Sequence, residues 1–177
     1  TWAGDVSLTG TGGTIQTAFA ANTLDITGVI GGSGNLIVNT ASSGGLVKFS
    51  GVNTYSGTTS ISGAGTELRV SGEIGNSGPA GTVTVNAGAK LSGSGIVLAN
   101  VAALANSTIA ATGNGFTLGN SASAAGFDTA GTLTVGAFAV TLRDSNAAVL
   151  GPTTTLAGGT LTAANGVSLS SGDVLSG

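Results

Sequence analysis

Short runs of alternating apolar and polar residues, separated by glycine or asparagine, are the feature of this sequence that most limits its possible folds. In each run two apolar side chains at positions i and i+2 fall on one face of an extended strand, and their neighbours are Ser, Thr, Asn, Gly or a charged residue. The pattern predicts many short β-strands, each with a single apolar face. The clearest pairs are Val6/Leu8, Leu24/Ile26, Leu36/Val38, Val47/Phe49, Leu68/Val70, Val83/Val85, Phe116/Leu118, Leu133/Val135 and Val167/Leu169.

The connections between these runs separate the possible all-β architectures. No convincing amphipathic helix lies between them, which excludes ordinary βαβ units. An antiparallel sandwich needs Asn-Gly or Asp-Gly turns between two alternating runs. The Asn-Gly pairs at Asn114 and Asn165 each precede one strand candidate only, so the glycine-rich corners favour a solenoid of short strands. One stretch, Ala-rich residues 99–111, is a candidate helix.

A slip in the alternation predicts a corner late in the chain. Leu133 and Val135 share one phase, whereas Phe138, Val140 and Leu142 share the other. A one-residue slip would turn the second set outward in a straight strand. We therefore expect a corner or bulge at Gly136.

Composition excludes several classes of function. The 177 residues include 33 Gly but only four Lys or Arg and seven Asp or Glu, with no Cys, His or Met. Disulfides, thiolate metal sites and catalysis by His or Cys are thus impossible. A net charge of −3 argues against nucleic acid or an anionic membrane as a partner, and no apolar run is long enough for a membrane helix. Because the chain opens at Thr1 without a signal sequence, we expect a mature or excised segment.

Paired carboxylates are the signature of sugar-cleaving β-helices, and Asp5 with Asp25 is the best candidate pair. Aligning residues 6–8 with residues 24–26 stacks Asp25 over Ser7 and places Asp5 near Thr23. The two carboxylates would then avoid each other. We therefore expect no catalytic, cofactor-binding or metal-binding residues.

Other polar and aromatic residues have a functional and a structural interpretation. Glu67 and Arg69 share a strand face near Glu73, either as a small recognition patch or, the interpretation we favour, as an exposed ion pair that keeps the strand soluble. Residues 143–146 are typical of a polar turn. Trp2 and Tyr55 could stack on a sugar, but we expect each to pack at a corner or a rung end.

The order of several phrases resembles a known repeat. Residues 2–15 read W-A-G-D-V-S-L-T-G-T-G-G-T-I, residues 51–59 read G-V-N-T-Y-S-G-T-T, and residues 81–97 read G-T-V-T-V-N-A-G-A-K-L-S-G-S-G-I-V. This order resembles the passenger-associated transport repeat of autotransporter β-helical passengers over residues 2–98, with a looser continuation over residues 99–177. The resemblance implies a right-handed parallel β-helix with rungs of about 20–25 residues, exported and displayed outside the cell.

Residues 1–177 are therefore expected to form one all-β domain, a right-handed parallel β-solenoid (β-helix) of about eight rungs. Its single elongated core should contain Leu24, Ile26, Leu36, Val38, Leu68, Val70, Val83 and Val85.

The favoured function is that of a non-catalytic structural element of a bacterial surface fibre, filament, biofilm matrix or adhesin stalk. It would either associate head to tail or continue a longer solenoid, without a cofactor. The alternatives are an adhesin module that binds a surface glycan or host molecule and, least favoured, a polysaccharide-cleaving β-helix.

Overall fold

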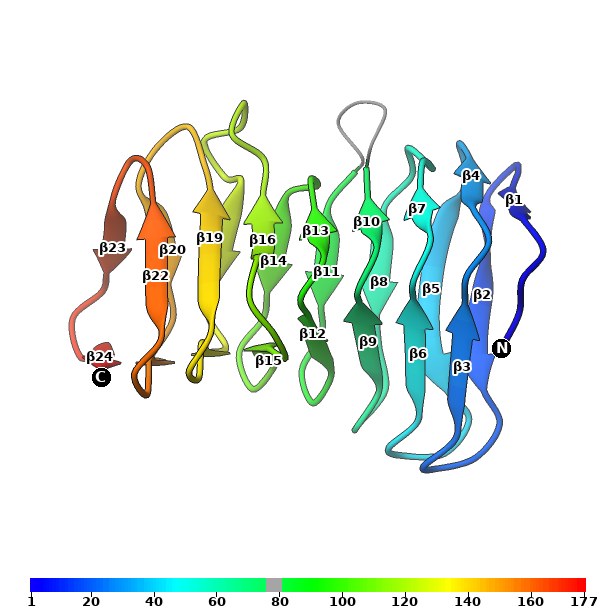
Figure 1. Cartoon of the computed structure of the whole chain (residues 1–177), viewed down its shortest axis with the longest axis horizontal. Coiled ribbons are helices and arrows are strands. Elements are labelled where there is room, and N and C mark those ends of the chain that lie inside the picture. The colour runs from blue at the N-terminus through cyan, green and yellow to red at the C-terminus, as the bar shows by residue number, and fades with distance from the viewer. Residues whose placement is uncertain (76–80) are drawn as a thin grey trace.

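A computed structural model of the chain describes residues 1–75 and 81–177, and the elements assigned in these residues are all β-strands. The strands lie side by side along one long axis, with the two termini at opposite ends (Figure 1). Neighbouring strands in the sheets pair in parallel, for example β3 with β6 and β20 with β23. The chain is therefore a parallel β-solenoid, as predicted, and the antiparallel sandwich is excluded. The right-handed sense of the coil stays a prediction.

Three faces run along the solenoid. Face I carries β2 (Gly12–Thr17), β5 (Asn35–Thr40), β8 (Thr59–Ile61), β11 (Val83–Val85), β14 (Val101–Ala103), β17 (Phe127–Thr129), β20 (Ala148–Leu150) and β23 (Val167–Leu169). Face II carries β3 (Thr23–Ile26), β6 (Leu46–Phe49), β9 (Glu67–Val70), β12 (Lys90–Gly93), β15 (Thr108–Ala111), β18 (Thr132–Thr134), β21 (Thr153–Thr155) and β24 (Val174–Ser176).

Face III is built from a six-stranded sheet and a pair of strands. The sheet contains β7 (Val52–Asn53), β10 (Glu73–Ile74), β13 (Ile96–Val97), β16 (Phe116–Gly119), β19 (Ala139–Arg143) and β22 (Thr160–Ala163). The pair is β1 (Val6–Leu8) and β4 (Ile30–Gly32). The pair continues the same face, because the amide of Thr54 donates to the carbonyl of Ile30 at 2.8 Å, which sets β4 beside β7.

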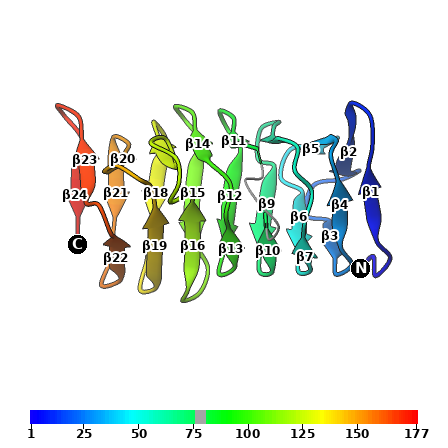
Figure 2. The ribbon, with the colours of Figure 1, turned by 90° about the horizontal axis from the view of Figure 1, so that it is seen from above.

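Each turn of the coil visits face II, then face III, then face I, and Figure 2 shows the same stacking from above. Faces I and II have eight strands each, so about seven turns separate the first strand of a face from its last. Turn length varies. On face II the step from Leu91 to its neighbour Ile109 is 18 residues, and the next step, to Leu133, is 24 residues.

The core is a set of apolar columns that run parallel to the axis. On face II, Leu24, Val47, Leu68, Leu91, Ile109 and Leu133 stack one above another. The eight residues predicted to share one core all belong to it, and only Leu24, in the first strand of face II, is partly exposed. The alternation of the sequence thus predicted correctly which side chains point inward.

The slip in the alternation coincides with a corner, as expected. Gly136 has φ of 65°, in the left-handed region that favours glycine, and lies between β18 and β19. The candidate helix over residues 99–111 was wrong, because these residues form β14 and β15. Alanine favours helix in isolation, but here Val101 and Ile109 lie inward in columns of parallel neighbours, and this packing overrides the propensity.

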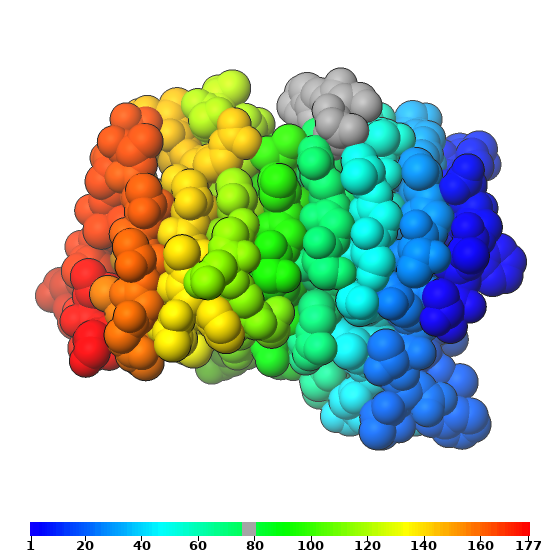
Figure 3. All heavy atoms as spheres, in the orientation of Figure 1, coloured from blue at the N-terminus to red at the C-terminus, as the bar shows by residue number. Residues whose placement is uncertain are grey.

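The outer shape is a rod with one projecting corner. Each rung forms a band across the rod, and the bands near residues 20 and 40 extend beyond the others on one side (Figure 3). The turns from β2 to β3 and from β5 to β6 lie at this corner. Phe19, with 68% of its surface exposed, lies in the first of these turns.

Candidate interaction surfaces

The predicted stacking of the candidate carboxylate pair was wrong. Ser7 lies opposite Gly31, and Asp25 lies opposite Lys48. The reason is that a rung has three strands, so residues 6–8 and residues 24–26 belong to different faces. Asp5 lies beside Val29 and not in its expected place near Thr23. Its Oδ1 accepts a hydrogen bond from the amide of Val29 at 2.9 Å.

Most of the acidic side chains hold the fold together. Within residues 1–75 and 81–177, five of the seven carboxylates accept hydrogen bonds, namely Asp5, Asp25, Glu67, Asp144 and Asp173. Buried Asp144, for example, accepts from the amides of Phe127 at 2.9 Å and Asn146 at 2.8 Å. The polar turn predicted over residues 143–146 is thus confirmed for residues 144–146, whereas Arg143 is the last residue of β19. Within the described residues, no group of three or more acidic side chains could hold a metal ion.

Charged residues from four neighbouring rungs form the charged cluster on face II. Lys48 Nζ lies 3.1 Å from Asp25 Oδ2, and Arg69 Nη2 lies 2.8 Å from Glu67 Oε1. The predicted pair of Glu67 and Arg69 is thus confirmed, but the Lys90 ammonium, 3.4 Å from Glu67 Oε2, extends it. The register of the strands creates the cluster, since it stacks Lys48 beside Arg69. Glu73, by contrast, lies in β10 on face III.

Glu67 is the best-connected acid of the charged cluster. Burial raises the pKa of its carboxyl, but hydrogen bonds from Ser92 and Arg69 and the charge of Lys90 outweigh this effect, so the pKa is lowered overall. Ser92 is fully buried and donates its hydroxyl proton to Glu67 Oε1. The side chains of the cluster are therefore held by more ion pairs and hydrogen bonds than the isolated, exposed ion pair that the sequence predicted.

A Glu67→Gln variant should show a weaker loss of stability in acid. The folded pKa of Glu67 lies below its ordinary value, so its contribution is complete above about pH 4.5 and disappears as the pH falls through the folded pKa. Urea unfolding between pH 6 and pH 3 should give a shallower decline for the variant than for the parent. Glu73→Gln, outside the cluster, is the control and should keep the parent's slope. Parallel curves for parent and Glu67→Gln would contradict the role assigned to the cluster.

The two aromatic candidates have different surroundings. Tyr55 packs at the corner between β7 and β8, as expected, and it is fully buried there. Burial raises the pKa of its hydroxyl to about 12, although a hydrogen bond with Thr59 opposes the shift. Trp2 is 54% exposed at the N-terminal end of the rod, where it forms an isolated parallel bridge with Ile26. Trp2 therefore lies at a rung end, also as expected.

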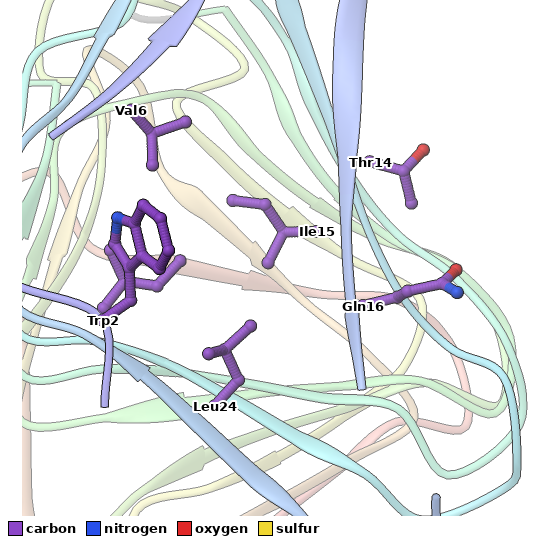
Figure 4. A pocket seen from close by; sticks show the side chains of 7 residues that line it. Trp2, Val6, Thr14, Ile15, Gln16 and Leu24 are labelled. Atoms are coloured by element: carbon purple, nitrogen blue, oxygen red, sulfur yellow. The ribbon is translucent and has the colours of Figure 1, made fainter. Parts of the chain in front are cut away.

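An apolar pocket of about 320 Å³ opens at the N-terminal end face. Figure 4 shows the indole of Trp2 and the side chains of Val6, Ile15 and Leu24 around a common space. Each of these three aliphatic residues heads a core column and has a neighbour on one side only. The pocket thus lies at the first rung, where these columns begin in the described residues.

The C-terminal end face is also apolar. Leu169 and Leu175 occupy the last positions of their columns, and each is 43% exposed. Equivalent positions in the middle of the rod, such as Val85 and Leu91, are fully buried. Composition could not reveal this contrast, because it depends on which strands lie at the ends.

A third surface is a shallow polar groove on face I. Side-chain hydroxyls and one amide line it, together with Ile37, which is exposed. Its lining is Thr11, Gly12, Gly13, Thr14, Asn35, Leu36, Ile37, Thr58 and Ser60.

Comparison with known proteins identifies no relative from which a function could be inferred. The fold and these surfaces are therefore the observations on which a function can be argued. No family model matches the chain, and neither a curated protein nor a solved structure is significantly similar to it. Among the described residues there is no helix long and apolar enough to cross a membrane.

Proposed function

We propose that the chain is a non-catalytic structural element at the surface of a bacterial cell, a rigid solenoid within a fibre, filament or adhesin stalk. One observation carries the proposal: largely apolar columns, interrupted by buried Asn53 and Thr154, run through stacked parallel rungs, while most carboxylates serve as structural hydrogen-bond acceptors. Such a stack resists bending, because each rung is bonded to its neighbours by backbone hydrogen bonds on all three faces.

Two further features support this role. The outer surface consists mainly of short, neutral side chains, which suits a spacer more than a site that must attract a charged ligand. The resemblance of residues 2–98 to the passenger-associated transport repeat favours display outside the cell.

Glycan binding is a second candidate because of the polar groove on face I. Asn35 and Ser60 offer amide and hydroxyl groups, and exposed Ile37 offers an apolar contact for a sugar ring. The amide oxygen of Asn35, however, already accepts a hydrogen bond from the amide of Thr58 at 2.9 Å. We therefore place this function second.

Antibodies against the chain should label intact cells of the bacterium that produces it, and permeabilisation should not raise the signal. A cytoplasmic enzyme labelled in parallel controls for leakage. Labelling that requires permeabilisation would contradict the surface role.

The purified chain should not depolymerise pectin, alginate or similar acidic glycans, with or without calcium. Asp5 and Asp25 are engaged by Val29 and Lys48, so neither is poised as an acid or base toward a substrate. Release of reducing ends that disappears in Asp5→Ala or Asp25→Ala would overturn the non-catalytic assignment.

A further inference from the structure

The charged cluster on face II contains three of the four basic residues of the chain, Lys48, Arg69 and Lys90. The carboxylates of Asp25 and Glu67 balance two of these three charges. The cluster is therefore locally positive on a chain whose net charge is −3. Exposed charges more than about 8 Å apart are largely screened at physiological salt, so an anion that approaches face II meets the cluster and not the net charge of the chain.

The basic side chains keep hydrogen-bond donors for a ligand. The Arg69 guanidinium has five N–H groups, and its Nε and Nη2 donate to Glu67 Oε1 at 3.1 and 2.8 Å. Within the described residues, its Nη1 has no acceptor. The Lys48 ammonium donates to Asp25 Oδ2 at 3.1 Å and has further protons to donate. About a third of each basic side chain in the cluster is exposed, so these donors can reach a ligand.

The two acids of the cluster hold the basic side chains in place. Ser50 Oγ donates to Asp25 Oδ1 at 2.7 Å, and Ser92 Oγ donates to Glu67 Oε1. Each carboxylate is thus fixed by a serine from the next rung, and it fixes a basic side chain in turn. A ligand therefore meets cations whose positions are already set, which lowers the entropy that binding costs.

A row of threonine hydroxyls continues from the cluster along the same face. The register places Thr108 opposite Lys90, Thr132 opposite Thr108, and Thr153 opposite Thr132. All three threonines are at least partly exposed, since they alternate with inward residues. Each rung contributes one polar group, so these groups recur about every 4.8 Å along the axis. The sugar units of an extended glycan advance by a comparable distance, and each unit carries hydroxyl groups.

We propose that face II binds an acidic glycan, whose carboxylates lie on the charged cluster and whose hydroxyl groups follow the threonine row beyond Lys90. A polyglutamate chain carries the same charge, but it has no hydroxyl groups for this row. Single-stranded nucleic acid is bound with the help of aromatic stacking, and the outward positions of β3, β6, β9 and β12 hold no aromatic side chain. The inference goes beyond the structural role, because it gives the rod a polymer to hold.

Isothermal titration calorimetry with polygalacturonate, an unbranched polymer of a carboxylated sugar, tests the site. The parent chain should bind this polymer at low salt, and added salt should weaken the binding, because the charges on both partners are exposed. Fully methyl-esterified polygalacturonate is the matched ligand control. It has the same sugar units without the charge, and it should not bind.

The double variant Lys48→Gln/Lys90→Gln should bind polygalacturonate about five- to tenfold more weakly, since two exposed charge contacts are lost. Arg143→Glu is the matched control. It lowers the net charge by the same two units, but Arg143 lies in β19 on face III, so this variant should bind like the parent. Circular dichroism should show the parent's spectrum for both variants.

A variant with an added charge tests the site without removing any contact. Thr132→Lys places a fourth cation on the row that continues from Lys90, and it should strengthen binding about two- to fivefold. Thr141→Lys adds the same charge on β19 of face III and should leave the affinity unchanged.

Several outcomes would overturn the acidic-glycan site. A parent chain that binds no polygalacturonate, or that binds the methyl ester equally well, would exclude a contact through the cluster. Equal affinity in Lys48→Gln/Lys90→Gln and Arg143→Glu, or in Thr132→Lys and Thr141→Lys, would assign the polymer to another surface. Equally tight binding of polyglutamate would show that the cluster recognises charge alone. If polygalacturonate does not bind yet antibodies label intact cells, the surface role stands and only the glycan site fails.

Discussion

Replacement of Asn53 by alanine should lower the free energy of unfolding by about 2–5 kcal/mol. Asn53 is fully buried in the core of face III. Its Oδ1 accepts from the amide of Ile30 at 2.9 Å, and its Nδ2 donates to the carbonyls of Gly51 at 3.2 Å and Glu73 at 3.0 Å. One side chain thus ties three successive rungs together. Alanine would leave these backbone groups without the amide, in a place where water does not replace it.

Urea unfolding monitored by circular dichroism measures this effect. Asn22→Ala is the matched control, because Asn22 is exposed at a corner, and it should change stability by less than about 0.5 kcal/mol. An Asn53→Ala variant as stable as the Asn22→Ala variant would show that the buried amide is not a structural requirement.

The buried side chain of Asn53 also explains a structural role of residues 51–59, the segment that most clearly resembles the passenger-associated repeat. Residues 51–59 contain both Asn53 and Tyr55, and both side chains are buried and hydrogen-bonded. The phrase resembles the passenger-associated repeat, but its residues alone do not show that Asn53 points inward. No local signal indicates it, because β7 is a two-residue strand without an alternating apolar pair.

The direction of side chains could be predicted from the sequence, whereas their neighbours could not. Alternation is a local property, and it placed residues such as Leu68 and Val83 correctly in the core. Stacking depends on the number of residues in each turn, which varies with the corners. The same apolar pair can belong to any of three faces, and this ambiguity caused the wrong alignment of residues 6–8 with residues 24–26.

The charged cluster shows the same limit. Glu67 and Arg69 are two residues apart on one strand, so their contact could be predicted. Lys48 and Lys90 are about one turn away in either direction, and only the register brings them beside this pair. The apolar pocket at the N-terminal end needed the whole topology, since Val6, Ile15 and Leu24 come from three consecutive strands, β1, β2 and β3, on three different faces.

Alanine substitutions at two leucines of one column should differ strongly in their effects. Leu91 and Leu175 both belong to the inward column of face II, but Leu91 is fully buried and Leu175 is 43% exposed. Leu91→Ala removes buried methyl groups and leaves a cavity, so it should cost about 2–5 kcal/mol of stability. Leu175→Ala should cost less than about 0.5 kcal/mol when measured in dilute, monomeric solution.

The comparison also tests how cooperative the rod is. In a stack where each rung contacts only its neighbours, a cavity in a central rung weakens the link between the two halves, whereas a change in the last rung affects only that end. Hydrogen exchange should therefore be faster in Leu91→Ala for amides of β9, β12 and β15, and it should leave the outer strands nearly unchanged. Uniformly faster exchange along the whole chain would instead mean that the rungs unfold as a single unit. A large loss for Leu175→Ala in dilute solution would mean that the terminal rung is part of the cooperative core.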